Sequence, residues 1–136
     1  MSPVDGAGGD VGAALVLDWA FVDSDAGDSQ TAYAMRRQIG AGTLYYWRAS
    51  DSTWQAAEVK NTETATTLTL ASGWGADGDA NHKYAVKTWD DIDAAGVYSA
   101  ELTVVPSVPD LPTITTPTNA ATWVTSAMTV IWTATT

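Results

Sequence analysis

Hydrophobic and polar residues alternate with a period of two along much of the chain, a pattern typical of β-strands that bury one face. In the segment 14–22, for example, Leu15, Leu17 and Trp19 fall on a single face. The segments that alternate in this way, or that are rich in aromatic and β-branched residues, are 14–22, 32–39, 43–49, 53–59, 66–70, 83–89 and 97–104. We therefore expect these segments to be strands.

Segments rich in Gly, Asp, Asn and Ser separate these strands. Gly40 and Gly42 bound one turn, and Asp51-Ser52 predicts a tight turn between two aromatic-rich strands. No stretch shows a helical period of useful length. Closely spaced strands joined by such turns predict an all-β fold, an antiparallel β-sandwich.

Prolines gather near the end of this strand-rich region, at positions 106, 109, 112 and 117. Proline lacks the N–H group that a sheet interior requires and has a fixed φ, so a proline-rich segment suits a stiff linker. We therefore expect a sandwich domain over residues 1–106, a linker over 107–117 and a further structural unit over 118–136.

The segment after the linker repeats the start of the chain. Pro3-Val-Asp-Gly leads toward Trp19 in an apolar strand, and Pro117-Thr-Asn-Ala leads toward Trp132 in a similar context. Two strands alone cannot bury a hydrophobic face. We therefore expect residues 118–136 to be the first strands of a second, incomplete copy in a longer tandem protein, or to complete their core by pairing with another chain.

The residues named so far resemble a fibronectin type III domain. Trp19 matches the buried tryptophan in the second strand of that fold, and Leu70 with Tyr84 matches its tyrosine corner, although the loop between them is longer than in the family. More narrowly, the segment from Trp19 to Tyr33, together with Gly73-Trp-Gly and Lys87-Thr-Trp-Asp, is similar to modules in tail and other virion proteins of bacteriophages that infect actinobacteria.

The resemblance implies a non-enzymatic structural or adhesive module of a bacteriophage virion, in a tail, fibre or other surface protein. Such a module makes assembly contacts or attaches to the host surface, so the implied partners are other virion proteins, further copies of the chain and a host cell-surface glycan. Related modules occur in bacterial surface proteins and polysaccharide enzymes. The alternative is therefore a carbohydrate-binding or spacer module of an extracellular bacterial protein or enzyme.

The composition and charge of the chain exclude several classes of partner. Sixteen acidic residues against six basic residues give a formal charge of −10, which repels phosphate backbones and anionic lipids, so we expect no nucleic acid partner. No stretch approaches the roughly 18 apolar residues of a membrane-spanning helix, so we expect no membrane insertion. Nothing at the N-terminus resembles an export signal, and the resemblance places the chain on a virion or, in the alternative, outside a cell.

Catalytic side chains are scarce. The chain has no cysteine, which excludes disulfides and thiolate chemistry, and His82 is its single histidine. His82 lies in the segment Asp-Ala-Asn-His-Lys, which predicts a solvent-exposed loop residue. The aspartates cluster in segments that read as turns. We therefore expect no enzymatic activity and no catalytic residues.

Tryptophans are the candidate ligand-binding residues, since seven of them occur and a flat indole offers a face to a sugar ring. Trp19 and Trp132 lie in apolar strands and are expected in a core. Trp47 and Trp54 lie on adjacent short strands, and Trp74 lies in a Gly-Trp-Gly loop, so these three are the candidates for ligand contact. Trp54 and Trp74 are the two that we expect at a ligand-binding surface.

An acidic loop is the candidate metal site. Asp23, Asp25 and Asp28 place carboxylates at the first, third and sixth positions of a segment that resembles the start of a calcium loop but lacks the later glutamate. Asp77 and Asp79, or Asp90 and Asp91, would supply further oxygen ligands from neighbouring loops. The alternative is an Asx-type turn in which the carboxylates accept local backbone N–H groups. Ca²⁺ is the only cofactor that the sequence suggests.

Overall fold

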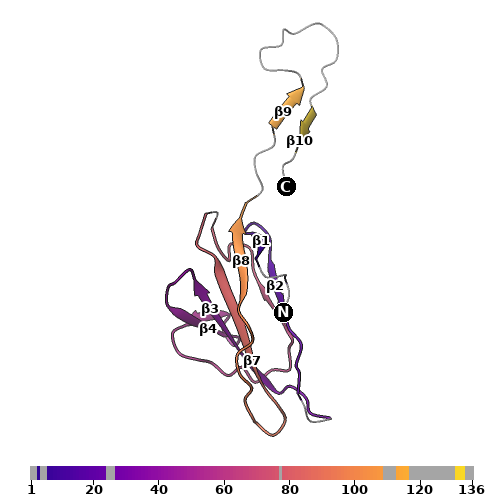
Figure 1. Cartoon of the computed structure of the whole chain (residues 1–136), viewed down its shortest axis with the longest axis vertical. Helices are drawn as coiled ribbons and strands as arrows, with labels where there is room; N and C mark the ends of the chain where they lie inside the picture. The colour runs from indigo at the N-terminus through magenta and orange to yellow at the C-terminus, as the bar shows by residue number, and fades with distance from the viewer. Residues whose placement is uncertain are drawn as a thin grey trace.

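The computed structural model describes residues 3, 6–23, 27–76, 78–108, 113–116 and 131–133, and for the last two ranges the backbone alone. Over these residues the chain is all-β, with ten strands and no helix (Figure 1). None of the described segments forms a helix long and apolar enough to cross a membrane. The prediction of an all-β fold is therefore confirmed.

The larger sheet has six strands in the order β1-β8-β7-β3-β4-β5. Their bounds are β1 Ala7–Asp10, β8 Leu102–Ser107, β7 His82–Trp89, β3 Ala32–Ile39, β4 Leu44–Arg48 and β5 Thr53–Gln55. Neighbouring strands are antiparallel except for β1, which is parallel to β8. The sheet is therefore mixed, and the expectation of an antiparallel arrangement is wrong at this edge.

A second, smaller sheet pairs β2 (Leu15–Asp18) with β6 (Thr67–Leu70). Its register places Leu15 opposite Leu70 and Leu17 opposite Leu68, so all four leucines face one side. These leucines share one hydrophobic core with residues of the larger sheet, namely Tyr33, Met35, Tyr84, Val86 and Val104. The alternation in the sequence therefore predicted the buried face of both sheets correctly.

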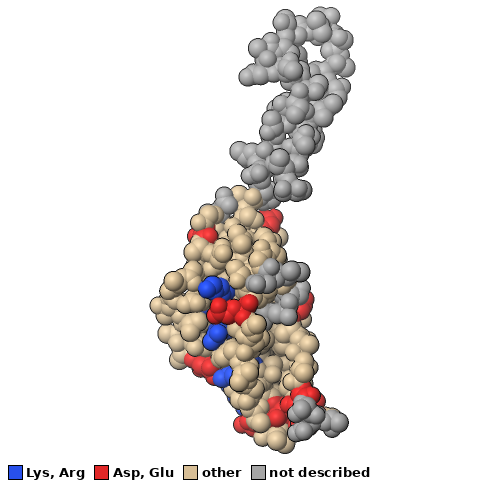
Figure 2. All heavy atoms as spheres, in the orientation of Figure 1, with Lys and Arg blue, Asp and Glu red and all other residues tan. Residues whose placement is uncertain are grey.

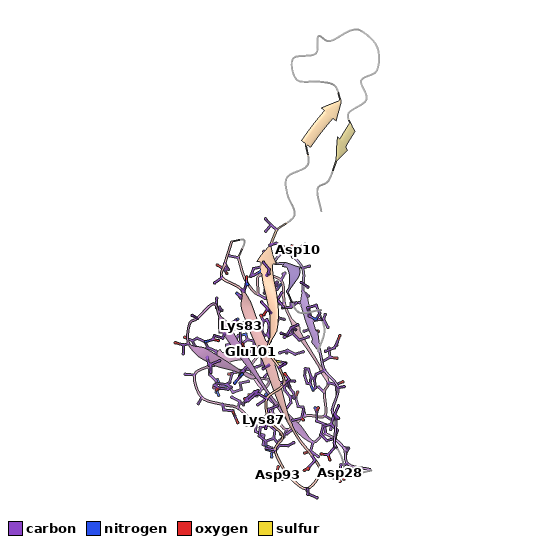
Figure 3. The ribbon with its side chains drawn as sticks, in the orientation of Figure 1. Asp10, Asp28, Lys83, Lys87, Asp93 and Glu101 are labelled. Carbon is purple, nitrogen blue, oxygen red and sulfur yellow. The ribbon has the colours of Figure 1, made fainter. Side chains whose placement is uncertain are left out.

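The opposite face of the larger sheet carries most of the positive charge. Arg36 lies over the ring of Tyr98 at 4.5 Å, and Lys87 lies over Trp89 at 4.7 Å. Figure 2 shows blue Lys and Arg side chains next to red carboxylates on this side of the molecule, and Figure 3 labels Lys83, Lys87 and Glu101 in the same orientation. The ion pairs of this chain include Arg36–Glu101, Lys83–Glu101, Lys87–Glu58, Lys60–Asp93 and, in the β4–β5 turn, Arg48–Asp51.

Strand β1 has no signal in the sequence, because Ala-Gly-Gly-Asp has low β propensity. It forms through long-range pairing, with Gly9 opposite Pro106. Strand β8 in turn continues through Pro106 to Ser107, because proline is tolerated where its missing N–H is not needed. Several expected strands are also shorter than predicted, since β2 ends at Asp18, β5 ends at Gln55 and β8 begins only at Leu102.

A buried asparagine fixes the connection between β5 and β6. The backbones of Asn61 and Tyr33 exchange two hydrogen bonds of 2.8 and 2.9 Å. The Asn61 side chain accepts a hydrogen bond from the Ala49 N–H at 2.9 Å and donates one to the Trp47 carbonyl at 3.1 Å. Asn61 therefore ties this connection to both β3 and β4, and holds the strand that carries Trp47.

The chain after Ser107 contains a separate two-stranded sheet, β9 (Thr113–Thr116) paired antiparallel with β10 (Ile131–Thr133). Strand β9 falls within the predicted linker. Trp132 lies in β10, whereas its predicted counterpart Trp19 follows β2, which pairs with β6. The remainder of 109–136 lies outside the described residues, so the second copy and the domain division stay predictions.

Candidate functional site

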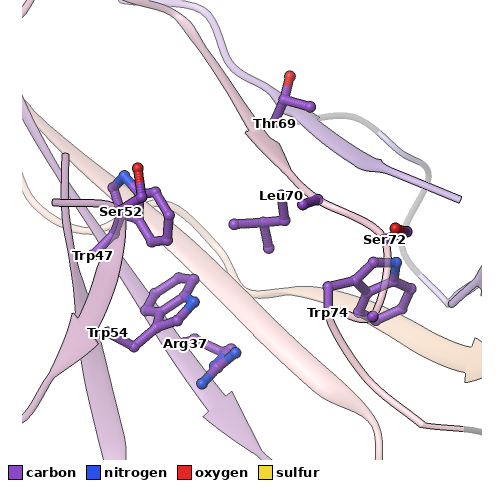
Figure 4. A pocket seen from close by; sticks show the side chains of 10 residues that line it. Arg37, Trp47, Ser52, Trp54, Thr69, Leu70, Ser72 and Trp74 are labelled. Atoms are coloured by element: carbon purple, nitrogen blue, oxygen red, sulfur yellow. The ribbon is translucent and has the colours of Figure 1, made fainter.

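A groove of about 400 Å³ opens where the two sheets part, between the β4–β5 hairpin and the loop that follows β6. Trp47 and Trp54 line one side, Trp74 lines the other, and Leu70 lies between them (Figure 4). The structure therefore brings together Trp54 and Trp74, the two residues that the sequence singled out for ligand binding. It adds Trp47 and, beside Trp54, Arg37.

The β4–β5 hairpin sets the positions of Trp47 and Trp54. The two residues are direct cross-strand partners, and their rings meet edge to face with centroids 5.3 Å apart. Such an aromatic pair contributes about 0.5–1.5 kcal/mol beyond its buried area. The turn between the strands has Ser52 at a φ of 56°, and Asp51 accepts hydrogen bonds from Arg48. The tight turn predicted at Asp51-Ser52 is confirmed.

The edge strand β1 packs against Trp74 and fixes its position. Its side chain is only 8 % exposed, and its indole Nε1 donates a hydrogen bond of 3.3 Å to the Asp10 carbonyl. A Cβ atom on Gly9 would lie 2.7 Å from the Trp74 ring, so glycine permits this close approach. The position of Trp74 therefore depends on the pairing of β1 with β8, two segments that are distant in the sequence.

Arg37 places a positive charge in the groove. It projects from β3, and its guanidinium lies over the Trp54 ring at 4.4 Å and contacts Tyr84. Burial lowers the pKa of Arg37 below its ordinary value, while nearby Tyr84 and Tyr45 act in the opposite direction. Arginine nevertheless stays charged in proteins. Within the described part of the chain, no carboxylate forms an ion pair with Arg37.

His82 and Tyr84 lie beneath the groove. His82 is 1 % exposed and begins β7, so the expectation of an exposed loop histidine is wrong. Pairing with Ile39 and with Val104 on its two sides draws this residue into the sheet. Its ring packs edge to face against Trp74 at 5.3 Å, and its Nδ1 lies 3.2 Å from the Tyr84 hydroxyl.

Burial governs the protonation of both residues. It raises the pKa of Tyr84 to about 12 even though Arg37 acts to lower it. Burial also lowers the pKa of His82 below its ordinary value of 6.5; the charge of Arg37 adds to this effect, and Asp79 opposes it. Both side chains are therefore neutral near pH 7.

The lowered pKa of His82 predicts a loss of stability in mild acid. The unfolded chain takes up a proton near pH 6.5 and the folded chain only at lower pH, so the free energy of unfolding falls as pH drops below about 6.5. Urea denaturation at pH 7.5, 6.5 and 5.5 measures this dependence. His82→Gln should show a weaker dependence, and identical slopes for the two proteins would contradict the assignment.

The predicted calcium loop is partly assembled. Carboxylate oxygens of Asp23, Asp28 and Asp90 lie within 4.8 Å of one another, and Asp25 lies outside the described residues. Asp90 is 7 % exposed and accepts hydrogen bonds from the N–H groups of Ile92 and Ala94, as an Asx-type turn requires. The calcium site stays a prediction, which calorimetric titration with Ca²⁺ tests.

Arg37 is a groove residue that sequence reasoning did not single out for binding, whereas Trp47 was weighed with Trp54 and Trp74. Arg37 left a signal, since it occupies the same face of its strand as the core residues Tyr33 and Met35. A charged residue at a core-facing position needs a partner or a function. Trp47 lies in a strand directly paired with that of Trp54.

The groove thus combines three indole rings, two serine hydroxyls from Ser52 and Ser72, and one guanidinium. Comparisons with models of known protein families, with curated proteins and with solved structures find no match for this chain. The function is therefore argued from the chemistry of the groove.

Proposed function

We propose that this chain is a non-enzymatic attachment module that binds a sugar residue of a cell-surface glycan in the groove. The observation that carries this proposal is the convergence of three tryptophans on a single groove. Trp47 and Trp74, each 8 % exposed, form its walls, and the half-buried Trp54 is the most accessible of the three indoles. An indole face accepts the C–H face of a pyranose ring, and the hydroxyls of Ser52 and Ser72 are suited to hydrogen bonds with sugar hydroxyls.

The size of the groove supports a small ligand. Its volume of about 400 Å³ lies toward the lower end of the range of roughly 300–1,000 Å³ for small-molecule pockets. Trp54 is half-buried and Ser52 and Ser72 are exposed, so these side chains can be reached from solvent. A short saccharide fits this description better than a long peptide.

The lining supports binding rather than catalysis. None of the ten residues that line the groove is Asp, Glu or His. Hydrolysis of a glycosidic bond ordinarily requires a pair of carboxyl groups on either side of that bond. The groove is therefore suited to hold a sugar without cleaving it.

We further propose that the fold is a fibronectin type III-like sandwich and that it serves on a bacteriophage virion. Two sheets share one core, and Trp19 and Tyr84, the residues that carry the resemblance, are both buried. On a tail or fibre the groove would face a host glycan. The same module in an extracellular bacterial protein or enzyme would bind a polysaccharide.

A structural spacer is the second candidate, and the edges of the larger sheet favour it. The edge strands β1 and β5 have four and three residues, and short edge strands limit pairing with other chains. A spacer in a tandem or assembled protein needs such protected edges. The spacer predicts no affinity for sugars, so the experiment below separates the two functions.

The test is calorimetric titration of the protein with saccharides from bacterial cell surfaces, together with Trp fluorescence. We expect Trp54→Ala to reduce affinity at least about 10-fold, which corresponds to about 1.4 kcal/mol. Tyr46→Ala is the matched control, because Tyr46 is a half-buried aromatic residue on the face of β4 opposite Trp47 and does not line the groove. Thermal melting checks that both variants fold. Equal affinity of Trp54→Ala and the wild type, or no binding of any saccharide, would count against the proposal.

A further inference from the structure

We infer that the groove selects a sugar that carries a carboxylate, a uronic acid, and that Arg37 recognises this group. The inference rests on the proposed function, because it names the class of sugar that the groove would bind. It follows from the charge of the groove, the environment of Arg37 and its position beside Trp54.

The first argument is the pairing of positive charges. The chain has six Lys and Arg residues, and five of them have a carboxylate partner within 4.0 Å. Arg37 is the one that has no carboxylate partner among the described residues, although its side chain is half-buried. A charge removed from water without a counter-ion is unfavourable. An anionic ligand would supply the missing counter-ion.

The second argument concerns the donors of the guanidinium. Arginine presents five N–H donors in a planar fork that matches the two oxygens of a carboxylate. Arg37 contacts the Trp54 face and the Tyr84 hydroxyl, and its Nε, like that of the ion-paired Arg36, is buried with no hydrogen-bond partner among the described atoms. These contacts hold the side chain in place but do not neutralise its charge.

The third argument is position. The guanidinium lies 4.4 Å from the centre of the Trp54 ring, and Figure 4 shows the two side chains next to each other in the groove. The guanidinium covers one face of the Trp54 indole, so a pyranose ring can contact only the part of this indole that Arg37 leaves uncovered. A ring bound there brings one of its substituents within reach of Arg37. A carboxylate attached directly to the sugar ring fits this arrangement.

The surrounding charges are compatible with an anion despite the net charge of −10. None of the residues that line the groove is acidic. Asp51 is the acidic neighbour of Ser52 in the chain, and it is paired with Arg48. Repulsion by more distant carboxylates is screened beyond about 8 Å at physiological ionic strength. A single guanidinium also matches the single charge of a carboxylate better than the nearly double charge of a phosphate monoester.

The experiment titrates the wild-type protein with methyl glucuronide, its uncharged methyl ester and methyl glucoside, and repeats the series with the galactose counterparts. We expect at least one uronide to bind about 10-fold or more tightly than its ester and its neutral sugar. This comparison needs no variant. Equal affinities for the charged and uncharged forms would overturn the inference and leave the proposed function standing.

Variants test whether Arg37 causes the preference. Arg37→Met keeps an unbranched stem against Trp54 and removes the charge, so we expect it to lower the ratio of uronide affinity to neutral-sugar affinity about 10-fold. Arg36→Met is the matched control, because Arg36 lies on the opposite face of β3 over Tyr98. An unchanged preference in Arg37→Met would overturn the role of Arg37. If no sugar, charged or neutral, binds the wild type, the inference and the proposed function both fail.

Discussion

Replacing Asn61 by alanine is expected to lower the free energy of unfolding by roughly 3 kcal/mol, because it removes the side-chain partner of one buried and one partly buried backbone group, at about 1–3 kcal/mol each. These groups are the Ala49 N–H and the Trp47 carbonyl, which bind the Asn61 side chain. Asn61 itself is 6 % exposed, so water does not readily replace its amide. Urea denaturation at pH 7.5 measures the loss.

Asn81→Ala is the matched control for this substitution. Asn81 is exposed, and its carbonyl, which the substitution retains, accepts the Gly40 N–H. We therefore expect Asn81→Ala to change the free energy of unfolding by less than about 0.5 kcal/mol. A similar small change in Asn61→Ala would show that the side chain of Asn61 does not hold the β5–β6 connection to β4.

Replacing Gly9 by alanine is expected to lower the free energy of unfolding by about 1–3 kcal/mol, the usual cost of inserting a carbon atom into a well-packed core. The new Cβ would lie 2.7 Å from Trp74 and 2.9 Å from Val104, so one of these side chains must move. Because Trp74 forms a wall of the groove, we also expect weaker sugar binding. Denaturation and Trp fluorescence measure the two effects.

Gly8→Ala provides the comparison within the same strand. The nearest atom to a Cβ on Gly8 is the Ser107 hydroxyl oxygen at 3.8 Å, an ordinary contact. Neither glycine has a positive φ, so the two substitutions differ in packing and not in backbone strain. We expect Gly8→Ala to be neutral within about 0.5 kcal/mol. Equal stability of the two variants would mean that β1 does not pack against Trp74 as described.

Much of the candidate site was predictable from sequence, and the part that was not depends on contacts between distant segments. Trp54 and Trp74 were candidate ligand residues, and both line the groove. Asp23 and Asp28 were candidate metal ligands, and both lie near Asp90. The local pattern contained no information on which loops would face each other.

For Arg37, the sequence of its own strand predicts the face of the sheet but not the residues that it contacts. The alternation of β3 places it on the same face as the core residues, which the sequence indicates. Its lack of a carboxylate partner among the described residues depends on β4, β5 and β7, which bring Trp54 and Tyr84 to it instead. A residue can therefore be assigned to a face from sequence, but its partner cannot.

The sequence by itself determined the all-β class, the inward-facing leucines of β2 and β6, and the turn at Asp51-Ser52. These features follow from the period of two and from residues adjacent in the chain. Only the tertiary structure decided the parallel pairing of β1 with β8, the burial of His82 and the assembly of the groove. The physical reason is that pairing and packing between distant segments override weak local preferences, as they do in the glycine-rich strand β1.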